Sequence, residues 1–275
     1  MPLSRTTSRA RRTTCSVLAI ATAVTASSCC GPTGGRGWGE DATLAPGWAR
    51  VRHAAADAAR APETWVPVGA ALAFQIGDAD REVSEWAADH TPLFGSGEDA
   101  REASDFLYAS AVAAYVTTSL AAPSACPEGA WVTQKCKGIA VGAAAGVTTE
   151  QLTLAVKRAS GRLRPDGSSH DSFPSAHASG AAVYATLASK NLESLPLSGT
   201  TRTIARVGFA GLAAGTAWAR VEGRKHFPSD VLVGVALGHF LGSFFHDAFL
   251  GPSGSLAPEV TLGSGSVELG LRWRF

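Results

Sequence analysis

The chain has 275 residues, of which 45% are hydrophobic and 17% are charged, and its formal net charge is +1. The length suffices for one large or two small domains with a buried core, and the composition excludes a disordered polyelectrolyte. The nearly neutral charge excludes a broad nucleic-acid surface that depends on bulk positive charge, so we expect no nucleic-acid partner. A mean hydropathy of +0.09 leaves both a soluble and a membrane protein open.

Residues 1–28 have the pattern of an export signal. Four arginines and no acidic residue precede an apolar run at residues 16–26, whose length suits a signal-peptide core rather than a membrane span. Small residues then lead to Cys29, as in a loose form of the bacterial lipoprotein processing site, with Ala26 where leucine is usual. The sequence leaves two outcomes open, a lipid anchor on Cys29 or ordinary signal cleavage nearby.

Export predicts a periplasmic or cell-envelope location, where conditions are oxidising. There Cys126 and Cys136 would close a small loop by a disulfide, with two free thiols as the alternative. Their spacing does not suit a zinc site, and the sequence contains no Cys/His cluster that supports one. We therefore expect no bound metal.

Residues 29–50 predict a flexible tether, because this segment is rich in Gly, Pro and Thr, and a folded domain is expected at residues 51–250. Within the domain, apolar and alanine-rich runs recur with helical periodicity. These runs cover residues 65–77, 106–125, 138–156, 176–189, 204–220 and 231–245. They predict an all-α helical bundle, in which the many Ala and Gly residues allow close helix packing.

Membrane contact is predicted through the anchor rather than through spanning helices. Only residues 106–125 are as long, without a charge, as a span requires, and most other runs are shorter or are broken by charges such as Arg206. We favour a water-soluble bundle anchored at a membrane, and a polytopic membrane protein is the alternative.

The tail at residues 251–275 follows a different pattern. From Val267 to Phe275 apolar and other residues alternate with a period of two, which predicts a strand. Residues 260–262 and the turn-like residues 263–266 precede it, so the tail is predicted to form a short β-hairpin.

Three segments in the second half of the chain carry candidate chemistry. Lys157 to Pro165 has the form K-x6-RP, Pro174 to His177 has the form PSxH, and Arg220 to Asp230 has the form R-x5-H-x3-D. Each alone has an ordinary interpretation, such as a solvated basic face, a helix cap or a surface ion pair. All three in this order are not expected by chance in a chain of this size.

This order of motifs resembles the signature of the type 2 phosphatidic acid phosphatase (PAP2) superfamily, which also contains bacterial class A acid phosphatases and vanadium haloperoxidases. The resemblance implies an all-helical domain of the PAP2/haloperoxidase type. Two positions depart from the commonest pattern: Ala176 stands where glycine is usual, and Ala219 where serine is frequent. Both residues are small, so the departures concern backbone approach and one hydroxyl contact rather than the reaction class.

The resemblance implies that one group of residues binds phosphate. A transferring phosphoryl group spreads negative charge over its oxygens, which fixed donors must meet. Lys157 supplies a point charge, and Arg164 and Arg220 supply planar forks that grip two oxygens each. Pro174 predicts a helix start at Ser175 and Ala176, whose backbone N–H groups suit an anion.

The resemblance also implies a catalytic group of His226, His177 and Asp230. His226 would attack phosphorus and form a phosphohistidine, and Asp230 would accept the other ring N–H of His226. His177 would protonate the departing oxygen and later activate water. Three cations would then do the work that Mg²⁺ does in kinases, so no cofactor is expected, although vanadate would fit as a phosphate analogue.

The predicted function is thus an exported, metal-independent phosphatase that acts on phosphomonoesters, with lipid phosphates or a prenyl pyrophosphate as plausible substrates. The alternatives are a vanadate-dependent haloperoxidase and an inactive structural lipoprotein of the same fold. Other polar residues near the motifs are given ordinary roles. Arg158, Arg162, Arg224 and Lys225 would raise the local potential, His170 and Asp171 would lie at the mouth of the site, and His239 would be a core or interface residue.

Overall fold

The computed structural model describes residues 37–124, 130–251, 257–263 and 266–272. The helices are α1 (Trp48–Arg60), α2 (Pro62–Ala73), α3 (Ala79–His90), α4 (Gly97–Ala121), α5 (Ala130–Ser160), α6 (Ala176–Asn191), the 3-10 turn η2 (Leu192–Ser194), α7 (Gly199–Glu222), α8 (Pro228–Phe245) and the π-helical turn η3 (His246–Leu250). The strands β1 (Ala257–Gly263) and β2 (Ser266–Arg272) follow. The predicted all-α bundle is confirmed.

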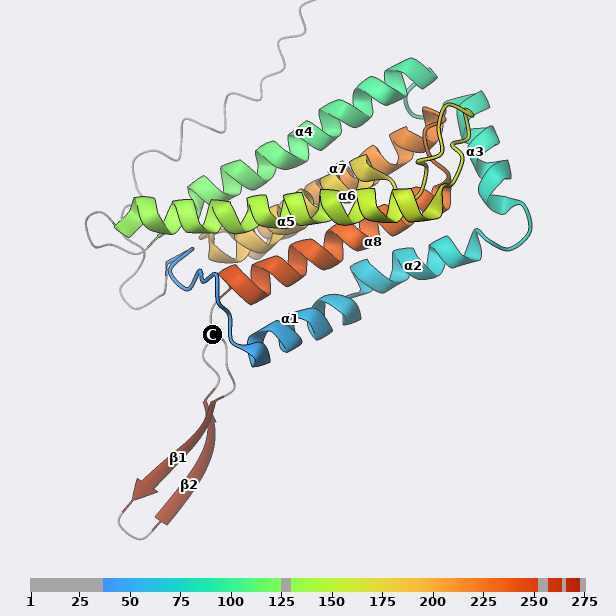
Figure 1. Cartoon of the computed structure of the whole chain (residues 1–275). Coiled ribbons are helices and arrows are strands. Elements are labelled where there is room, and N and C mark those ends of the chain that lie inside the picture. The colour runs from blue at the N-terminus through green and yellow to red at the C-terminus, as the bar shows by residue number, and fades with distance from the viewer. Residues whose placement is uncertain (1–36, 125–129, 252–256, 264–265, 273–275) are drawn as a thin grey trace, which may run out of the picture.

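The helices α6 and α8 form the centre of the bundle. Helix α6 packs against α4, α5, α7 and α8, while α8 also contacts α1 and α2, which run along its other side (Figure 1). These two helices carry two of the three motif segments at their amino-terminal ends. The packing between them therefore sets how those segments lie relative to each other.

Glycines at every fourth position of α8 allow its close approach to α6. A Cβ atom at Gly234 would lie 2.7 Å from the carbonyl oxygen of Ser175, and one at Gly242 would lie 3.0 Å from the carbonyl oxygen of Val183. Since real Cβ atoms do not approach a backbone oxygen so closely, only glycine permits this contact at Gly234. The predicted close packing of small residues is realised at this interface.

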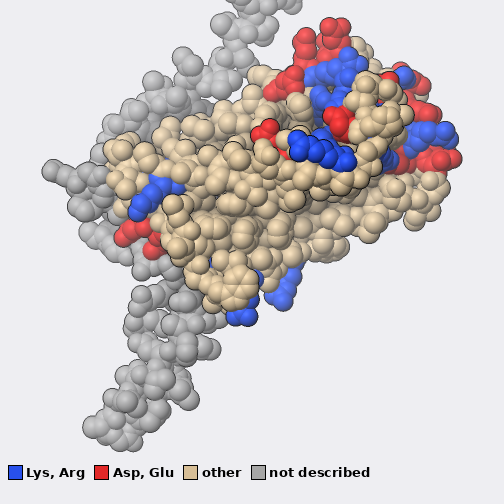
Figure 2. Space-filling view, viewed as in Figure 1, with Lys and Arg blue, Asp and Glu red and all other residues tan. Residues whose placement is uncertain are grey.

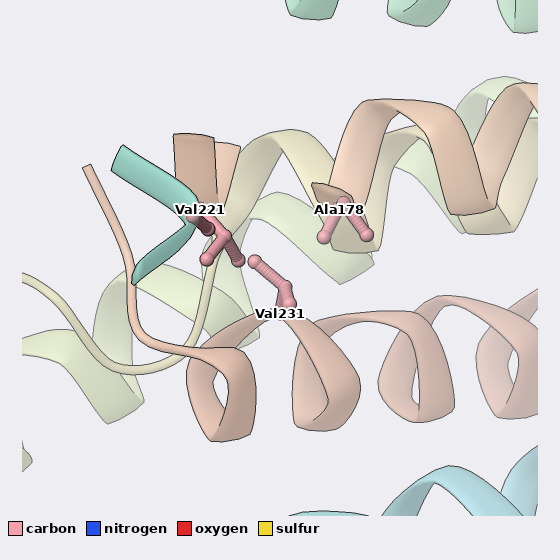
Figure 3. Packing of buried hydrophobic residues seen from close by; sticks show 5 residues of the cluster. Ala178, Val221 and Val231 are labelled. Atoms are coloured by element: carbon pink, nitrogen blue, oxygen red, sulfur yellow. The ribbon is translucent and has the colours of Figure 1, made fainter. Parts of the chain in front are cut away.

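A small apolar cluster lies directly behind the motif residues. Ala178, Val221 and Val231 point toward one another from α6, α7 and α8 (Figure 3), and Ala87 and Ala217 complete the cluster. These three labelled residues follow His177, Arg220 and Asp230 in the sequence. Burial of the cluster thus fixes the helix ends that carry the candidate functional side chains.

Local sequence signals explain where α6 and α8 begin. Ser175 is the N-cap of α6, and its hydroxyl accepts a hydrogen bond from the N–H of Ala178 at 3.4 Å. Pro228 opens α8, and the carboxylate of Asp230 accepts from the N–H of Phe227 at 2.9 Å. The residues that set the first turn of each helix therefore belong to the second motif for α6 and to the third motif for α8.

The structure differs from the prediction in the segment before the domain. Trp38 lies within the expected tether, but it is buried against Ala122, Val141 and Leu250, and its indole N–H donates to Asn191 at 2.9 Å. An indole buries a large apolar area, so it anchors the chain that carries it. The described part of the predicted tether therefore belongs to the folded bundle, while the predicted signal at residues 1–28 and Cys29 lie outside the described residues.

In the part of the chain that the structure describes, two helices other than the predicted one are long and apolar enough to cross a membrane. They are the segments Trp131–Ser160 and Pro228–Leu250. The predicted segment at residues 106–125 belongs to α4, which ends at Ala121 and has Thr and Ser residues in its last turns. The length of an uncharged run was therefore the wrong criterion for a membrane span, because it ignores these weakly polar side chains.

The carboxy-terminal tail forms an antiparallel pair of strands, with Val260 opposite Leu269. The side chains of β1 and β2 lie outside the described residues. The predicted hairpin therefore stays a prediction where packing is concerned.

Candidate active site

The three motif segments meet at one end of the bundle. This end contains the last turn of α5, the start of α6, the last turn of α7 and the start of α8, joined by the loops at residues 161–175 and 223–227. Charged side chains gather at this end, while the middle of the visible face is largely uncharged (Figure 2). A site for a charged ligand is expected where fixed charges converge.

Hydrogen bonds between the segments hold them together. The N–H of Ser175 donates to the carbonyl oxygen of Asp230 at 3.0 Å, which ties the second motif to the third. The ammonium of Lys157 donates to the carbonyl oxygen of Asp171, and the N–H of His226 donates to the carbonyl oxygen of Arg220 at 3.2 Å. Segments separated by many residues thus share one hydrogen-bonded framework.

His226 is buried and holds a defined tautomer. Its Nδ1 atom lies 2.7 Å from the carbonyl oxygen of Ser172, and because a carbonyl can only accept, Nδ1 carries the proton. Burial lowers the pKa of His226 to about 4; the positive charges of Lys157 and Arg220 act in the same direction, and Asp230 acts against them. The neutral ring therefore keeps Nε2 free of a proton at neutral pH.

The predicted hydrogen bond from His226 to Asp230 is absent. The two side chains are 3.8 Å apart, between Nδ1 and Oδ2, which is too long for a hydrogen bond. Asp230 instead accepts from the hydroxyl of Ser172 at 2.6 Å, so it orients the segment whose carbonyl holds His226. The carboxylate acts on the histidine through Ser172, a residue that the sequence did not single out.

Arg162 also has a structural role, which the sequence did not predict. Its guanidinium donates to Asp230 at 2.7 Å, to Ser229 at 2.8 Å and to Asp80 of α3 at 2.6 Å. It also lies over the ring of Phe227, 4.3 Å from the ring centre. This clamp joins α3, the first motif and the start of α8. No local pattern identifies Asp80, because its partners are far away in the chain.

His177 lies at the more open side of the site. Its side chain is 35% exposed, and its Nε2 atom lies 2.9 Å from a carboxylate oxygen of Asp105 on α4. Burial lowers the pKa of His177, Arg220 and Arg164 act in the same direction, and Asp105 acts against them. The sequence did not predict a role for Asp105.

Arg220 is a buried cation that forms no ion pair within 4 Å in the described part of the chain, although the charges of Asp105 and Asp166 act on it. Only 8% of the residue is exposed, one Nη donates to the hydroxyl of Ser104 at 3.2 Å, and its Nε has no hydrogen-bond partner. Its charge lowers the pKa of both His177 and His226, so it lies near each ring. A buried guanidinium with an unsatisfied N–H group is costly, and an anion would satisfy it.

The other two predicted phosphate-binding cations share one acidic neighbour. Arg164 donates two hydrogen bonds to the carboxylate of Asp171, at 2.8 and 3.1 Å, while Lys157 contacts the backbone of the same residue. Hydrogen bonding to Ser169 and Arg164 lowers the pKa of Asp171 to about 2. Both cations are thereby held at the site without the use of all their donors.

Ser175 and Ala176 stand at the positive end of α6. The Ser175 hydroxyl is buried and caps the helix, so it is already engaged in a hydrogen bond within its own segment. The N–H groups of Ala176 and His177, at the first two positions of the helix, have no helical acceptor. These two groups, rather than the hydroxyl, are the donors that the helix offers to an anion.

The remaining predicted residues occupy the edges of the site or lie away from it. Lys225 pairs with Asp166 at 2.7 Å, Arg224 pairs with Asp89, and His170 contacts the carbonyl of Gly161 at 3.2 Å. His239 contacts Thr64 of α2 at 2.8 Å. Cys136 is exposed on α5, and its predicted partner Cys126 lies outside the described residues, so the disulfide stays a prediction. No group of three His, Cys, Asp or Glu residues suited to a metal occurs within the described ranges.

Comparisons with known proteins support the resemblance of the helical domain. A family model described as the PAP2 superfamily matches residues 138–250, which contain all three motifs. The chain is also similar to a solved structure described as the first transmembrane PAP2 type phosphatidylglycerolphosphate phosphatase from Bacillus subtilis, with a TM-score of 0.51 and 22% identity over 65% of this chain and 90% of that chain. No curated protein matches the sequence. The resemblance predicted from the motifs is confirmed.

Proposed function

Because residues 138–250 match the family model of the PAP2 superfamily, we propose that this protein is a phosphatase that cleaves phosphomonoesters through a phosphohistidine on His226. The observation that supports this most is Arg220, a buried cation whose Nε has no partner among the described residues and which lies near two histidines in different environments. One histidine is neutral and buried, and the other is open to a ligand. A phosphate group between them would satisfy Arg220.

In the first step, Nε2 of His226 attacks phosphorus, and the bond from phosphorus to the ester oxygen breaks. The leaving oxygen takes a proton from His177. The hydrogen bond from Nδ1 to Ser172 stays in place and stabilises the positive charge that develops on the ring of His226. In the second step, His177 takes a proton from water, the water oxygen attacks phosphorus, and the bond to Nε2 breaks to release phosphate.

The bound phosphoryl group is held by donors from each of the three motifs. Lys157, Arg164 and Arg220 supply positive charge, and the N–H groups of Ala176 and His177 supply neutral donors. Burial lowers the pKa of Arg220 to about 10, so its guanidinium remains charged at neutral pH. We propose that these fixed donors stabilise the transition state without a metal ion.

A lipid phosphate is the substrate class that the surface favours. Only 28% of the apolar window in Trp131–Ser160 is buried, and 44% of that in Pro228–Leu250, whereas a core helix of a soluble protein is mostly buried. Large apolar side chains are also exposed on α2 and α7, including Trp65, Leu72 and Ile204. We propose that these surfaces contact lipid, and that the site receives a phosphorylated headgroup at the edge of the membrane. The export signal predicted at residues 1–28 would place that site on the outer side of a cell membrane.

The test uses the full chain in detergent, with a chelator present and three substrates: a soluble aryl phosphate, a phosphatidic acid and a prenyl pyrophosphate. His226→Ala is expected to reduce kcat at least about 1,000-fold, because it removes the nucleophile. The matched control is His53→Ala, which changes an exposed histidine of α1 far along the chain. Vanadate should compete with phosphate at the same site. Unchanged phosphate release by His226→Ala would disprove the assignment of the nucleophile. Loss of activity in the presence of the chelator, restored when a metal ion is added, would disprove the metal-free mechanism.

A further inference from the structure

Asp105 is an acidic residue at the site that comes from outside the three motifs. It lies on α4, and its carboxylate contacts the Nε2 atom of His177 at 2.9 Å, although 72 residues separate the two in sequence. Its side chain is 69% exposed, so burial does not force it into this position. An exposed carboxylate that nevertheless meets the ring of His177 needs a reason beyond packing.

The surroundings of His177 are otherwise positively charged. Arg220 from α7 and Arg164 from the loop face the ring, and both lower its pKa. The ring of Tyr108 on α4 also lies near His177, with 5.9 Å between the two ring centres, and it is uncharged at neutral pH. Asp105 acts in the opposite direction and favours the imidazolium, through both a hydrogen bond and its charge.

We infer that Asp105 is a positioning residue that favours the protonated ring of His177 and fixes which ring nitrogen serves the substrate. Its carboxylate accepts from the Nε2 proton, which leaves the Nδ1 proton to pass to the leaving oxygen. When the bond to phosphorus breaks, the Nδ1 proton moves to the leaving alcohol oxygen. The neutral ring keeps its proton on Nε2, which still donates a hydrogen bond to Asp105. Nδ1 then takes a proton from the attacking water. This inference depends on the proposed phosphatase function.

The test compares Asp105→Asn with Glu102→Gln, which removes an exposed carboxylate from the same helix without a contact to His177. Each variant is assayed with an alkyl or lipid phosphate and with an aryl phosphate. A poor leaving group needs the proton from His177, and a good one does not. Asp105→Asn should therefore reduce kcat/KM for the alkyl phosphate about 10- to 100-fold and that for the aryl phosphate much less. Glu102→Gln should behave like the unchanged protein with both substrates.

The pH profile provides the readout that a structural role would not change. Asp105 favours the charged ring, so Asp105→Asn should lower the pKa of His177 and move the alkaline limb of kcat/KM to lower pH. The ionisation of the substrate is the same in both proteins, so the difference belongs to the enzyme. An alkaline limb that stays in place, or an equal loss with both substrates, would overturn the inference.

A double-mutant cycle separates this inference from the phosphatase assignment. If Asp105 acts through His177, then Asp105→Asn should have little further effect in a His177→Ala background. Additive losses would show that Asp105 acts elsewhere. If His226→Ala abolishes turnover while Asp105→Asn leaves it unchanged, the phosphatase function stands and the inference about Asp105 is wrong.

Discussion

The substitution Gly234→Ala tests whether the contact between α6 and α8 sets the geometry of the site. The new Cβ atom would lie 2.7 Å from the carbonyl oxygen of Ser175, 3.2 Å from the Cβ atom of Ala178 and 3.3 Å from the N atom of Ser179. The first of these atoms is backbone, so it cannot turn away as a flexible side chain would. The two helices must separate by roughly 0.5–1 Å to restore ordinary contacts.

This separation has a cost in stability and a larger cost in rate. Overpacking costs about 1–3 kcal/mol, and the higher helix propensity of alanine returns about 0.5–1 kcal/mol, so we expect a net loss of up to about 2.5 kcal/mol. Ser175 precedes His177 and donates its N–H to the carbonyl oxygen of Asp230, so the shift also moves the two histidines apart. A displacement of this size is expected to reduce kcat about 10- to 100-fold.

The matched control is Gly211→Ala in α7, where nothing lies within 4 Å of the new Cβ atom. This substitution should stabilise the protein by about 0.5–1 kcal/mol and leave kcat unchanged. Thermal unfolding and phosphate release by both variants, measured in the same detergent, provide the comparison. Equal stability and equal activity of the two variants would refute the view that this interface positions the site.

Two further predictions concern the clamp and the pH dependence. Arg162→Met should destabilise the protein by about 3 kcal/mol, because it leaves the carboxylates of Asp230 and Asp80 without their shared guanidinium; an unchanged unfolding temperature would contradict the clamp. The kcat/KM of the unchanged protein should fall below about pH 4, where His226 becomes protonated, and should fall again as pH rises past the lowered pKa of His177, which lies below 6.5. A profile that is flat from pH 5 to pH 9 would show that His177 is not the acid.

The orphaned charge of Arg220 illustrates how a site of this kind trades stability for binding. The guanidinium is kept from water, and in the described residues a hydroxyl is its polar contact, through Nη1. An acidic residue in place of Ser104 would satisfy the cation, but its carboxylate would also compete with a phosphate ligand. Under the proposed function, the phosphate of the ligand would be the favourable partner of Arg220, which is the usual relation between preorganised donors and the charge that develops on a substrate.

The sequence alone predicted a phosphatase, the helical fold and a candidate set of site residues. The motifs place two histidines, three cations and Asp230 at spacings that are set within short segments. The starts of α6 and α8 also depend on local chemistry, since Ser175 caps one helix and Pro228 opens the other. Features of this kind can be predicted because the residues that cause them are neighbours in the chain.

Only the tertiary structure decided which groups hold those residues in place. Asp105 reaches His177 from α4, Asp80 reaches Arg162 from α3, and the carbonyl of Ser172 takes the place at His226 that had been expected for Asp230. The buried position of Trp38 and the exposure of α5 likewise follow from how distant helices pack. Contacts between residues that are far apart in sequence leave no periodicity or spacing to detect, so they appear only when packing brings the helices together.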